Sequence, residues 1–222
     1  MKTFSTPILI KRVLALSAAV LCLWGLLALD DRESVPVERV LDGDTIILAD
    51  GRHVRYIGIN APEIAHDDYP AEPLGDQALA CNRSLVLGKK VQLETDLDRK
   101  DRYNRLLAYV YLKDGVFVNR EIIRQGMAYC LYRSPNDRHF SALLKAQRQA
   151  MHEQKGLWAG LQPTNQPYSG NARSRRFHLP QCKSAAKTNP KNRRDFDSMW
   201  SAFYEGYAPC KRCLKDWQFQ VQ

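Results

Sequence analysis

The stretch VPVERVLDGDTIILADGRHVRYIGI (residues 35–59) decides how the chain folds. Residues 35–48 and 53–59 are rich in Val, Ile, Thr and Tyr, which favour extended backbone, so both runs are predicted as strands. Ala49-Asp50-Gly51-Arg52 joins them, and an Asp-Gly pair between two such runs is a hairpin signal. Residues 35–59 therefore predict an antiparallel pair of strands.

The elements predicted downstream alternate between helices and strands. Apolar spacing predicts helices over residues 75–87, 118–125 and 139–155, and Gly126 ends the second of them. Further strands are predicted over residues 91–95, 106–112 and 127–132. Five or so strands with helices in this order indicate an α+β domain, mainly β, built on a five-stranded OB-type barrel over residues 35–161.

Composition divides the chain after this domain. Residues 162–170 contain two prolines, polar side chains and a glycine, which predicts a linker. Residues 171–222 then form a small C-terminal module with 11 Lys/Arg and 4 Asp/Glu, so +7 of the formal net charge of +9 lies there. A basic segment of this kind favours phosphates or an anionic membrane as partner, and a solvated surface kept for solubility is the alternative.

Residues 1–34 carry a membrane-targeting pattern. Lys2, Lys11 and Arg12 precede an uncharged, mostly apolar run over residues 13–29, and the charged residues 30–33 follow it. The run fits an uncleaved signal anchor, which would be an N-terminal membrane helix, or a cleaved signal peptide, and the lack of an A-x-A site favours the anchor. Either segment places the rest of the chain outside the cytoplasm, periplasmic or extracellular: membrane-anchored if uncleaved, secreted if cleaved.

Four acidic and basic motifs follow one another between residues 42 and 105. They are Asp42-Gly43-Asp44-Thr45, Arg55, Asn60-Ala61-Pro62-Glu63 and Asp101-Arg102-Tyr103-Asn104-Arg105. The acidic turn offers oxygen ligands, which suit calcium or magnesium better than zinc. Arg55 and Arg105 can each hold a phosphate through two hydrogen bonds, and Glu63 can take a proton from water. Each motif alone fits an ordinary turn or surface, but the ordered set predicts a metal-dependent phosphodiesterase.

Residues from about 36 to 158 resemble the staphylococcal-nuclease (thermonuclease) family. The matching motifs are Val40-Leu41-Asp42-Gly43-Asp44-Thr45, Arg55-Tyr56-Ile57-Gly58-Ile59-Asn60-Ala61-Pro62-Glu63, Asp101-Arg102-Tyr103-Asn104-Arg105-Leu106-Leu107-Ala108-Tyr109, Val118-Asn119 and Arg124-Gln125-Gly126-Met127-Ala128. The resemblance implies an OB barrel with helices and calcium-dependent hydrolysis of DNA and RNA that leaves 3′-phosphates. By position it implies a catalytic trio of Arg55, Glu63 and Arg105. It also implies calcium ligands at Asp44 and at the backbone carbonyl of Ala61.

Asn60 departs from the family's pattern, which has a second calcium carboxylate at this position. An amide oxygen can still coordinate a hard cation, but the site carries one negative charge fewer, which weakens calcium binding. We therefore expect a nuclease with a weakened or altered metal requirement. A catalytically silent nucleic-acid-binding or scaffold protein on the same fold is the alternative, and the presence of Arg55, Glu63 and Arg105 favours the enzyme.

The C-terminal module has a separate set of candidate ligands, His178-x3-Cys182 and Cys210-x2-Cys213. Four such ligands in two close pairs fit a tetrahedral structural zinc site. A module this small buries little core, so a bound metal would stabilise it. A Cys210–Cys213 disulfide or unbound thiols are the alternatives.

The same module resembles the zinc-binding module of the Ada DNA-repair protein, with His178 in place of a cysteine. The matching residues are Ser174-Arg175-Arg176-Phe177-His178-Leu179-Pro180-Gln181-Cys182, Asn192-Arg193, Phe196 and Glu205-Gly206-Tyr207-Ala208-Pro209-Cys210-Lys211-Arg212-Cys213.

Basic residues of the module are candidates for binding nucleic acid, with an affinity that would fall as salt rises. They are Arg173, Arg175, Arg176, Arg193 and Arg194, in a segment that also carries the basic residues Lys191, Lys211 and Arg212. The aromatic residues between them are predicted as the module's core rather than as a stacking surface; they are Phe177, Phe196, Trp200, Phe203 and Tyr204. The expected partners are DNA and/or RNA and, through the N-terminal helix, the membrane, and no motif indicates a protein partner.

Two more cysteines, Cys81 and Cys130, fall on a predicted helix and a predicted strand. They form a disulfide across the barrel or stay two isolated buried thiols, and the sequence leaves both alternatives open because it does not fix the separation of their Cα atoms.

Overall fold

The computed structural model describes residues 34–66, 69–161, 165–215 and 217. All of them belong to one compact unit. The membrane-targeting segment predicted for residues 1–34 lies outside this part of the chain except for Ser34. None of the helices within the described ranges combines the length and the apolar character needed to cross a membrane.

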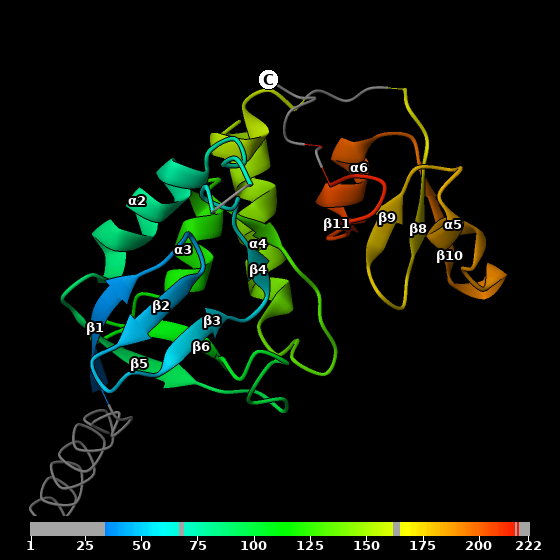
Figure 1. Cartoon of the computed structure of the whole chain (residues 1–222). Helices are drawn as coiled ribbons and strands as arrows, with labels where there is room; N and C mark the ends of the chain where they lie inside the picture. Colours follow the sequence, from blue (N-terminus) through cyan, green and yellow to red (C-terminus); the bar gives the residue numbers. More distant parts are fainter. Residues whose placement is uncertain (1–33, 67–68, 162–164, 216, 218–222) are drawn as a thin grey trace, which may run out of the picture. The chain divides into compact units, whose positions relative to one another are not determined.

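The first half of the described chain is built on a closed five-stranded barrel (Figure 1). In hydrogen-bonded order its strands are β1 (Ser34–Val40), β2 (Thr45–Leu48), β3 (His53–Tyr56), β6 (Leu106–Leu112) and β5 (Lys90–Glu94). β3 and β6 run parallel, and the other neighbours are antiparallel. The α+β class and the five-stranded barrel predicted from the sequence are confirmed.

The β-rich run over residues 35–48 is two strands, β1 and β2, separated at the predicted acidic turn of residues 42–45. The chain turns between them because the backbone N–H of Asp44 donates to Asp42 Oδ1 at 2.8 Å, and the N–H of Leu41 donates to the carbonyl of Thr45 at 3.0 Å. The predicted Asp-Gly turn follows β2, with Gly51 at a φ of 82°. Two hairpin turns therefore precede β3, and the first of them carries the acidic motif.

Three helices pack against the barrel core: α2 (Gly75–Val86), α3 (Val118–Arg124) and α4 (Phe140–His152). α3 ends at Gly126 as predicted, and this glycine has a φ of 74°. A Cβ at Gly126 would lie 2.2 Å from the carbonyl oxygen of Lys155, so no other residue fits there without a shift of backbone. The predicted strand over residues 127–132 is only β7 (Tyr129–Cys130), which pairs with β4 (Ile59–Asn60).

The C-terminal module is a four-stranded sheet with two short helices. The sheet order is β10 (Arg193–Phe196), β8 (Tyr168–Asn171), β9 (Arg176–His178) and β11 (Ala208–Pro209), and the helices are α5 (Lys183–Ala186) and α6 (Met199–Tyr204). β8 begins at Tyr168, within the stretch predicted as a linker. Short 3-10 helices lie at η1 (Gly156–Trp158) and η2 (Pro190–Asn192).

A second hydrophobic core joins this module to the barrel half. It contains Tyr129 and Trp158 from the first half and Phe177, Phe203 and Trp217 from the module. Phe177 and Phe203 are fully buried, as predicted for the aromatic residues of the module. The module therefore packs on α4 through α6 in a continuous apolar contact, and this contact fixes where its loops lie.

One buried side chain bridges the two halves with hydrogen bonds. Gln147, on α4, accepts from the backbone N–H of Cys130 through Oε1 at 2.6 Å and donates from Nε2 to the carbonyl of Phe203 at 2.6 Å. The side chain of Gln147 is fully buried, whereas Gln149, two residues further along the same helix, is exposed.

Replacing Gln147 with leucine should lower the free energy of unfolding by about 2–4 kcal/mol, because two buried backbone groups would lose their partners. Gln149→Leu is the matched control and should change the free energy of unfolding by less than about 0.5 kcal/mol. Urea denaturation of both variants measures the difference. Equal stability of the two variants would show that the bridge contributes nothing.

Candidate active site

A cavity of about 540 Å³ opens where the turn after β1, the loop after β3 and the loop before β6 meet. Its lining contains the predicted site residues Asp44, Arg55, Asn60, Glu63 and Arg105. Ala61, the other predicted ligand of this site, donates its backbone N–H to the carboxylate of Asp44. The structure thus brings together all the residues that the ordered motifs predicted as one site.

Asp44 is held in place by a turn that needs glycine. A Cβ at Gly43 would lie 2.5 Å from the Cβ of Ala61 and 2.8 Å from that of Ala78, so the turn packs against both only because residue 43 has no side chain. Asp44 is buried, and its Oδ2 accepts from the N–H of Ala61 at 2.8 Å. Its Oδ1 accepts from the hydroxyl of Thr45 at 3.2 Å.

Arg55, on β3, points its guanidinium at the same carboxylate. Its Nη2 lies 2.8 Å from Asp44 Oδ2 and 3.3 Å from Asn60 Oδ1. Its Nη1 donates to the carbonyls of Tyr56 at 2.7 Å and Ile59 at 3.0 Å. The loop after β3 therefore wraps around Arg55, and the guanidinium is fixed in orientation by main-chain oxygens.

The oxygens around Nη2 of Arg55 fit a hard cation. Asp44 and Asn60 each aim one oxygen at this positively charged nitrogen, and the carbonyl of Ala61 lies next to them, accepting from Asn60 Nδ2 at 3.2 Å. Carboxylate, amide and carbonyl oxygens are the ligands that calcium and magnesium prefer. Burial raises the pKa of Asp44 to about 7 although Arg55 opposes the rise. A second positive charge beside this carboxylate would therefore be favourable.

Glu63 borders the cavity, and two hydrogen bonds to Glu72 hold its loop in place. The N–H of Glu63 donates to Glu72 Oε2 at 3.0 Å, and the N–H of Glu72 donates to the carbonyl of Glu63 at 2.9 Å. Loss of solvent within the cavity raises the pKa of Glu63, and the nearby charge of Asp42 adds to the rise. A carboxylate with a raised pKa is a better base towards water than an ordinary surface glutamate.

Arg105 approaches from the loop before β6. Its Nε and Nη2 both bond to Asp101 Oδ2, at 2.8 and 2.7 Å, and its backbone N–H donates to Asp101 Oδ1 at 3.1 Å. The loop turns at Asn104, which has a φ of 62°. Arg105 is thus oriented by a carboxylate behind it, and its remaining N–H groups are left for an anion in the cavity.

The four predicted ligands of the C-terminal module also meet. The ligand atoms of His178, Cys182, Cys210 and Cys213 all lie within 4.8 Å of one another. β9 and β11 are adjacent strands, which places His178 beside Cys210. Nδ1 of His178 is buried and has no hydrogen-bond partner among the described residues, as expected for an atom that serves a metal. This donor set fits a tetrahedral metal ion.

The five cysteines in the described ranges are free thiols. Cys210 and Cys213 are therefore not joined as a disulfide in this structure, and neither are Cys81 and Cys130. Cys81 donates to Gln125 Oε1 at 3.3 Å, and Cys130 is buried.

The five arginines predicted to bind nucleic acid lie in different surroundings. Arg176 lines the cavity and donates to the carbonyl of Pro209 at 3.2 Å. Arg175 instead lies over aromatic rings, at 5.1 Å from the centroid of Phe140 and 5.4 Å from that of Tyr132. The other three are exposed; they are Arg173, Arg193 and Arg194. Arg193 pairs with Asp195 at 3.0 Å.

Several residues of the cavity were missing from the sequence-based site, Asp42 and Lys211 among them. Asp42 lines it, and the acidic turn itself was the signal that could have included this second carboxylate. Lys211 of the C-terminal module also lines it. The sequence marked Lys211 only as one of the basic residues of the module, because its place at the cavity depends on how the module packs on α4.

Comparison with known proteins identifies the family to which residues of this cavity belong. The family model described as "Staphylococcal nuclease homologue" matches residues 53–160. A thermonuclease of Staphylococcus intermedius is 38% identical over 129 residues, which cover 57% of this chain and 76% of that protein. A thermonuclease of Staphylococcus hyicus is 36% identical over 132 residues, covering 58% of this chain and 78% of that protein. The endonuclease YncB of Bacillus subtilis is 34% identical over 131 residues, covering 57% of this chain and 62% of that protein.

The stretch matched by the family model runs from β3 past α4 and includes Arg55, Glu63 and Arg105, which share one cavity with the acidic turn that precedes β2. The chain therefore belongs to the staphylococcal nuclease family, and as a nuclease of that family it is a metal-dependent phosphodiesterase.

Proposed function

We propose that this chain hydrolyses phosphodiester bonds of DNA and/or RNA with a calcium-type ion and leaves 3′-phosphates. The observation that carries the proposal is the common cavity of Asp44, Arg55, Asn60, Glu63 and Arg105. It combines oxygen ligands for a cation, two guanidinium groups for a phosphate and one carboxylate with a raised pKa.

Each residue has a defined part in this reaction. Arg55 and Arg105 bind the oxygens of the scissile phosphate and stabilise the negative charge that develops on them. Glu63 takes a proton from the attacking water, and the 5′-oxygen leaves with a proton from solvent. Asp44, Asn60 and the carbonyl of Ala61 would hold the ion, which supplies further stabilisation of negative charge when bound.

The amide at residue 60 favours a second candidate function, that of a nucleic-acid-binding or scaffold protein without catalysis. The amide nitrogen of Asn60 donates to Ala61 O and to the hydroxyl of Tyr129, and its oxygen accepts from Arg55, so residue 60 adds no negative charge to the site. The presence of both arginines and of Glu63 in the cavity supports the enzyme over this alternative.

Zinc is the ion we propose for the cluster of His178, Cys182, Cys210 and Cys213. Four ligand atoms within 4.8 Å and the buried, unpartnered Nδ1 of His178 support it. The likeness of residues 174–213 to the module of the Ada protein rests on sequence motifs and is part of the same proposal. Among the arginines proposed to bind nucleic acid, Arg176 is the best placed because it lines the cavity.

We also propose that residues 1–34 direct the enzyme outside the cytoplasm, as a membrane anchor or as a cleaved signal. The basic residues before the apolar run of residues 13–29 support this orientation.

Replacing Glu63 with glutamine should reduce kcat on single-stranded DNA by about 10²–10⁴-fold, because the amide cannot take a proton from water. Glu38, an exposed residue of β1, provides the control, and Glu38→Gln should cleave like the wild type. Initial rates at saturating DNA and calcium measure the effect. Wild-type turnover by Glu63→Gln would rule out Glu63 as the base, and a folded wild type that binds DNA without cutting it would support the silent binder.

Replacing Asn60 with aspartate should lower the calcium concentration needed for half-maximal cleavage, by on the order of tenfold, because a carboxylate would stand where an amide now faces Arg55. Calcium titrations of the wild type and of Asn60→Asp give this ratio. A calcium requirement that stays the same or increases would show that residue 60 does not contact the ion.

A further inference from the structure

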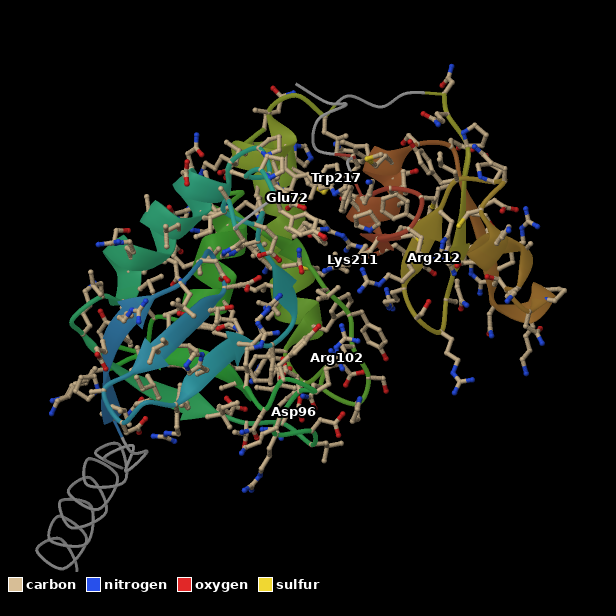
Figure 2. All side chains as sticks on the ribbon, viewed as in Figure 1. Glu72, Asp96, Arg102, Lys211, Arg212 and Trp217 are labelled. Carbon is tan, nitrogen blue, oxygen red and sulfur yellow. The ribbon has the colours of Figure 1, made fainter. Side chains whose placement is uncertain are left out.

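Lys211 reaches the nuclease cavity from the loop between two metal-ligand cysteines. It lines the 540 Å³ cavity together with Asp44, Arg55 and Arg105. It also lines a smaller neighbouring cavity of about 140 Å³ that contains Asn60, Glu63 and Glu72. Figure 2 shows Lys211 on the side of the module towards the barrel, with Arg212 lying further from it.

The loop that carries Lys211 is fixed from several directions. The N–H of Cys210 donates to the carbonyl of Phe177 at 2.9 Å, and the N–H of Leu214 donates to the carbonyl of Cys210 at 2.9 Å. Leu214 is buried in the second core, as is Trp217, whose ring lies 6.0 Å from that of Tyr129. Between these fixed points, Cys210 and Cys213 direct their sulfur atoms to the metal cluster.

Neighbouring residues in this loop have separate environments. Lys211 faces the active site, whereas Arg212 lines a different hollow together with Cys182 and Lys183. Both side chains are exposed and both are cationic. The loop therefore offers a matched pair, one cation at the active site and one away from it.

The charge of Lys211 is available to a ligand. Within the described ranges it has neither an ion pair nor a hydrogen-bond partner, unlike Arg55 and Arg105, which are both paired with carboxylates. Lys211 lines the active-site cavity with Glu63 and Arg105, and it also lines the smaller cavity with Glu63, which Arg105 does not reach. A polynucleotide that places its scissile phosphate against Arg55 and Arg105 would bring a neighbouring phosphate to Lys211.

We propose that Lys211 is a substrate-binding residue of the nuclease site, contacting a phosphate next to the scissile one, and that the metal cluster holds it there. This inference rests on the nuclease function proposed above. The cysteine cluster would then act on the nuclease through one lysine: a metal ion holding Cys210 and Cys213 would fix the loop, and the fixed loop would present the ammonium group to the polynucleotide.

Substitution of Lys211 tests the contact directly. In the full-length chain, Lys211→Met should raise KM for single-stranded DNA about five- to tenfold with kcat nearly unchanged, because a phosphate away from the reacting atoms loses a charged partner. The slope of log affinity against log salt should fall by about 0.7. Arg212→Met should leave KM and the salt slope as in the wild type. Equal KM values for the two variants, or a loss confined to kcat, would overturn the proposal.

Binding without turnover separates this inference from the proposed function. Fluorescence anisotropy of labelled single-stranded DNA on Glu63→Gln and on Glu63→Gln/Lys211→Met should show the same five- to tenfold loss of affinity. A wild type that does not cleave would refute the proposed function, while this affinity loss would still locate Lys211 at the bound strand. Identical affinities would refute the role of Lys211 even in an active nuclease.

A double-mutant cycle tests whether the site formed by His178, Cys182, Cys210 and Cys213 positions Lys211. Cys182→Ser should reduce bound zinc, measured by elemental analysis, below one per chain and raise KM in the wild-type background. In the Lys211→Met background it should raise KM no further, because the lysine through which it acts is gone. Additive effects on KM, or full zinc loss with an unchanged KM, would show that the cluster does not position Lys211.

Discussion

The buried carboxylate of Asp44 joins the three segments from which the active site is built. It belongs to the turn between β1 and β2, it accepts from Ala61 in the loop after β4, and it pairs with Arg55 on β3. Without Asp44, Arg55 would lose its ion-pair partner and Ala61 the acceptor of its N–H, and a buried guanidinium that loses its counter-charge is costly. Gly43 makes this arrangement possible, because a side chain at that position would push Ala61 and Ala78 away.

The same carboxylate explains why this site attracts a cation. Burial of Asp44 raises its pKa to about 7, so one guanidinium does not fully compensate for the loss of water around the negative charge. Asn60 adds an oxygen to the site but no charge. The negative charge of the site therefore comes from Asp44 and Asp42 rather than from residue 60, and on this ground we propose a nuclease with a modified metal requirement.

Much of the barrel and most of the site could be predicted from local sequence. The Asp50-Gly51 turn and the end of α3 at Gly126 depend on backbone conformations that glycine adopts easily, so short motifs suffice to locate them. Residues 35–48 form one β-rich run in the sequence, and only the Asp42-Gly43-Asp44-Thr45 motif indicated the turn within it. That turn forms through hydrogen bonds of Asp42 and Thr45. Lys211 and Arg175 could not be placed, because their surroundings come from residues far away in the chain, such as Glu63 and Phe140.

The role of Asp44 in a metal-dependent nuclease site is tested most directly by a calcium titration of DNA cleavage by the wild type beside Asp44→Asn, with a chelator added at the end. We expect wild-type cleavage to rise with calcium and to stop with the chelator, and Asp44→Asn to stay folded but to cleave at no calcium concentration near the wild-type rate. Cleavage by both proteins that is insensitive to calcium and chelator would contradict this role of Asp44.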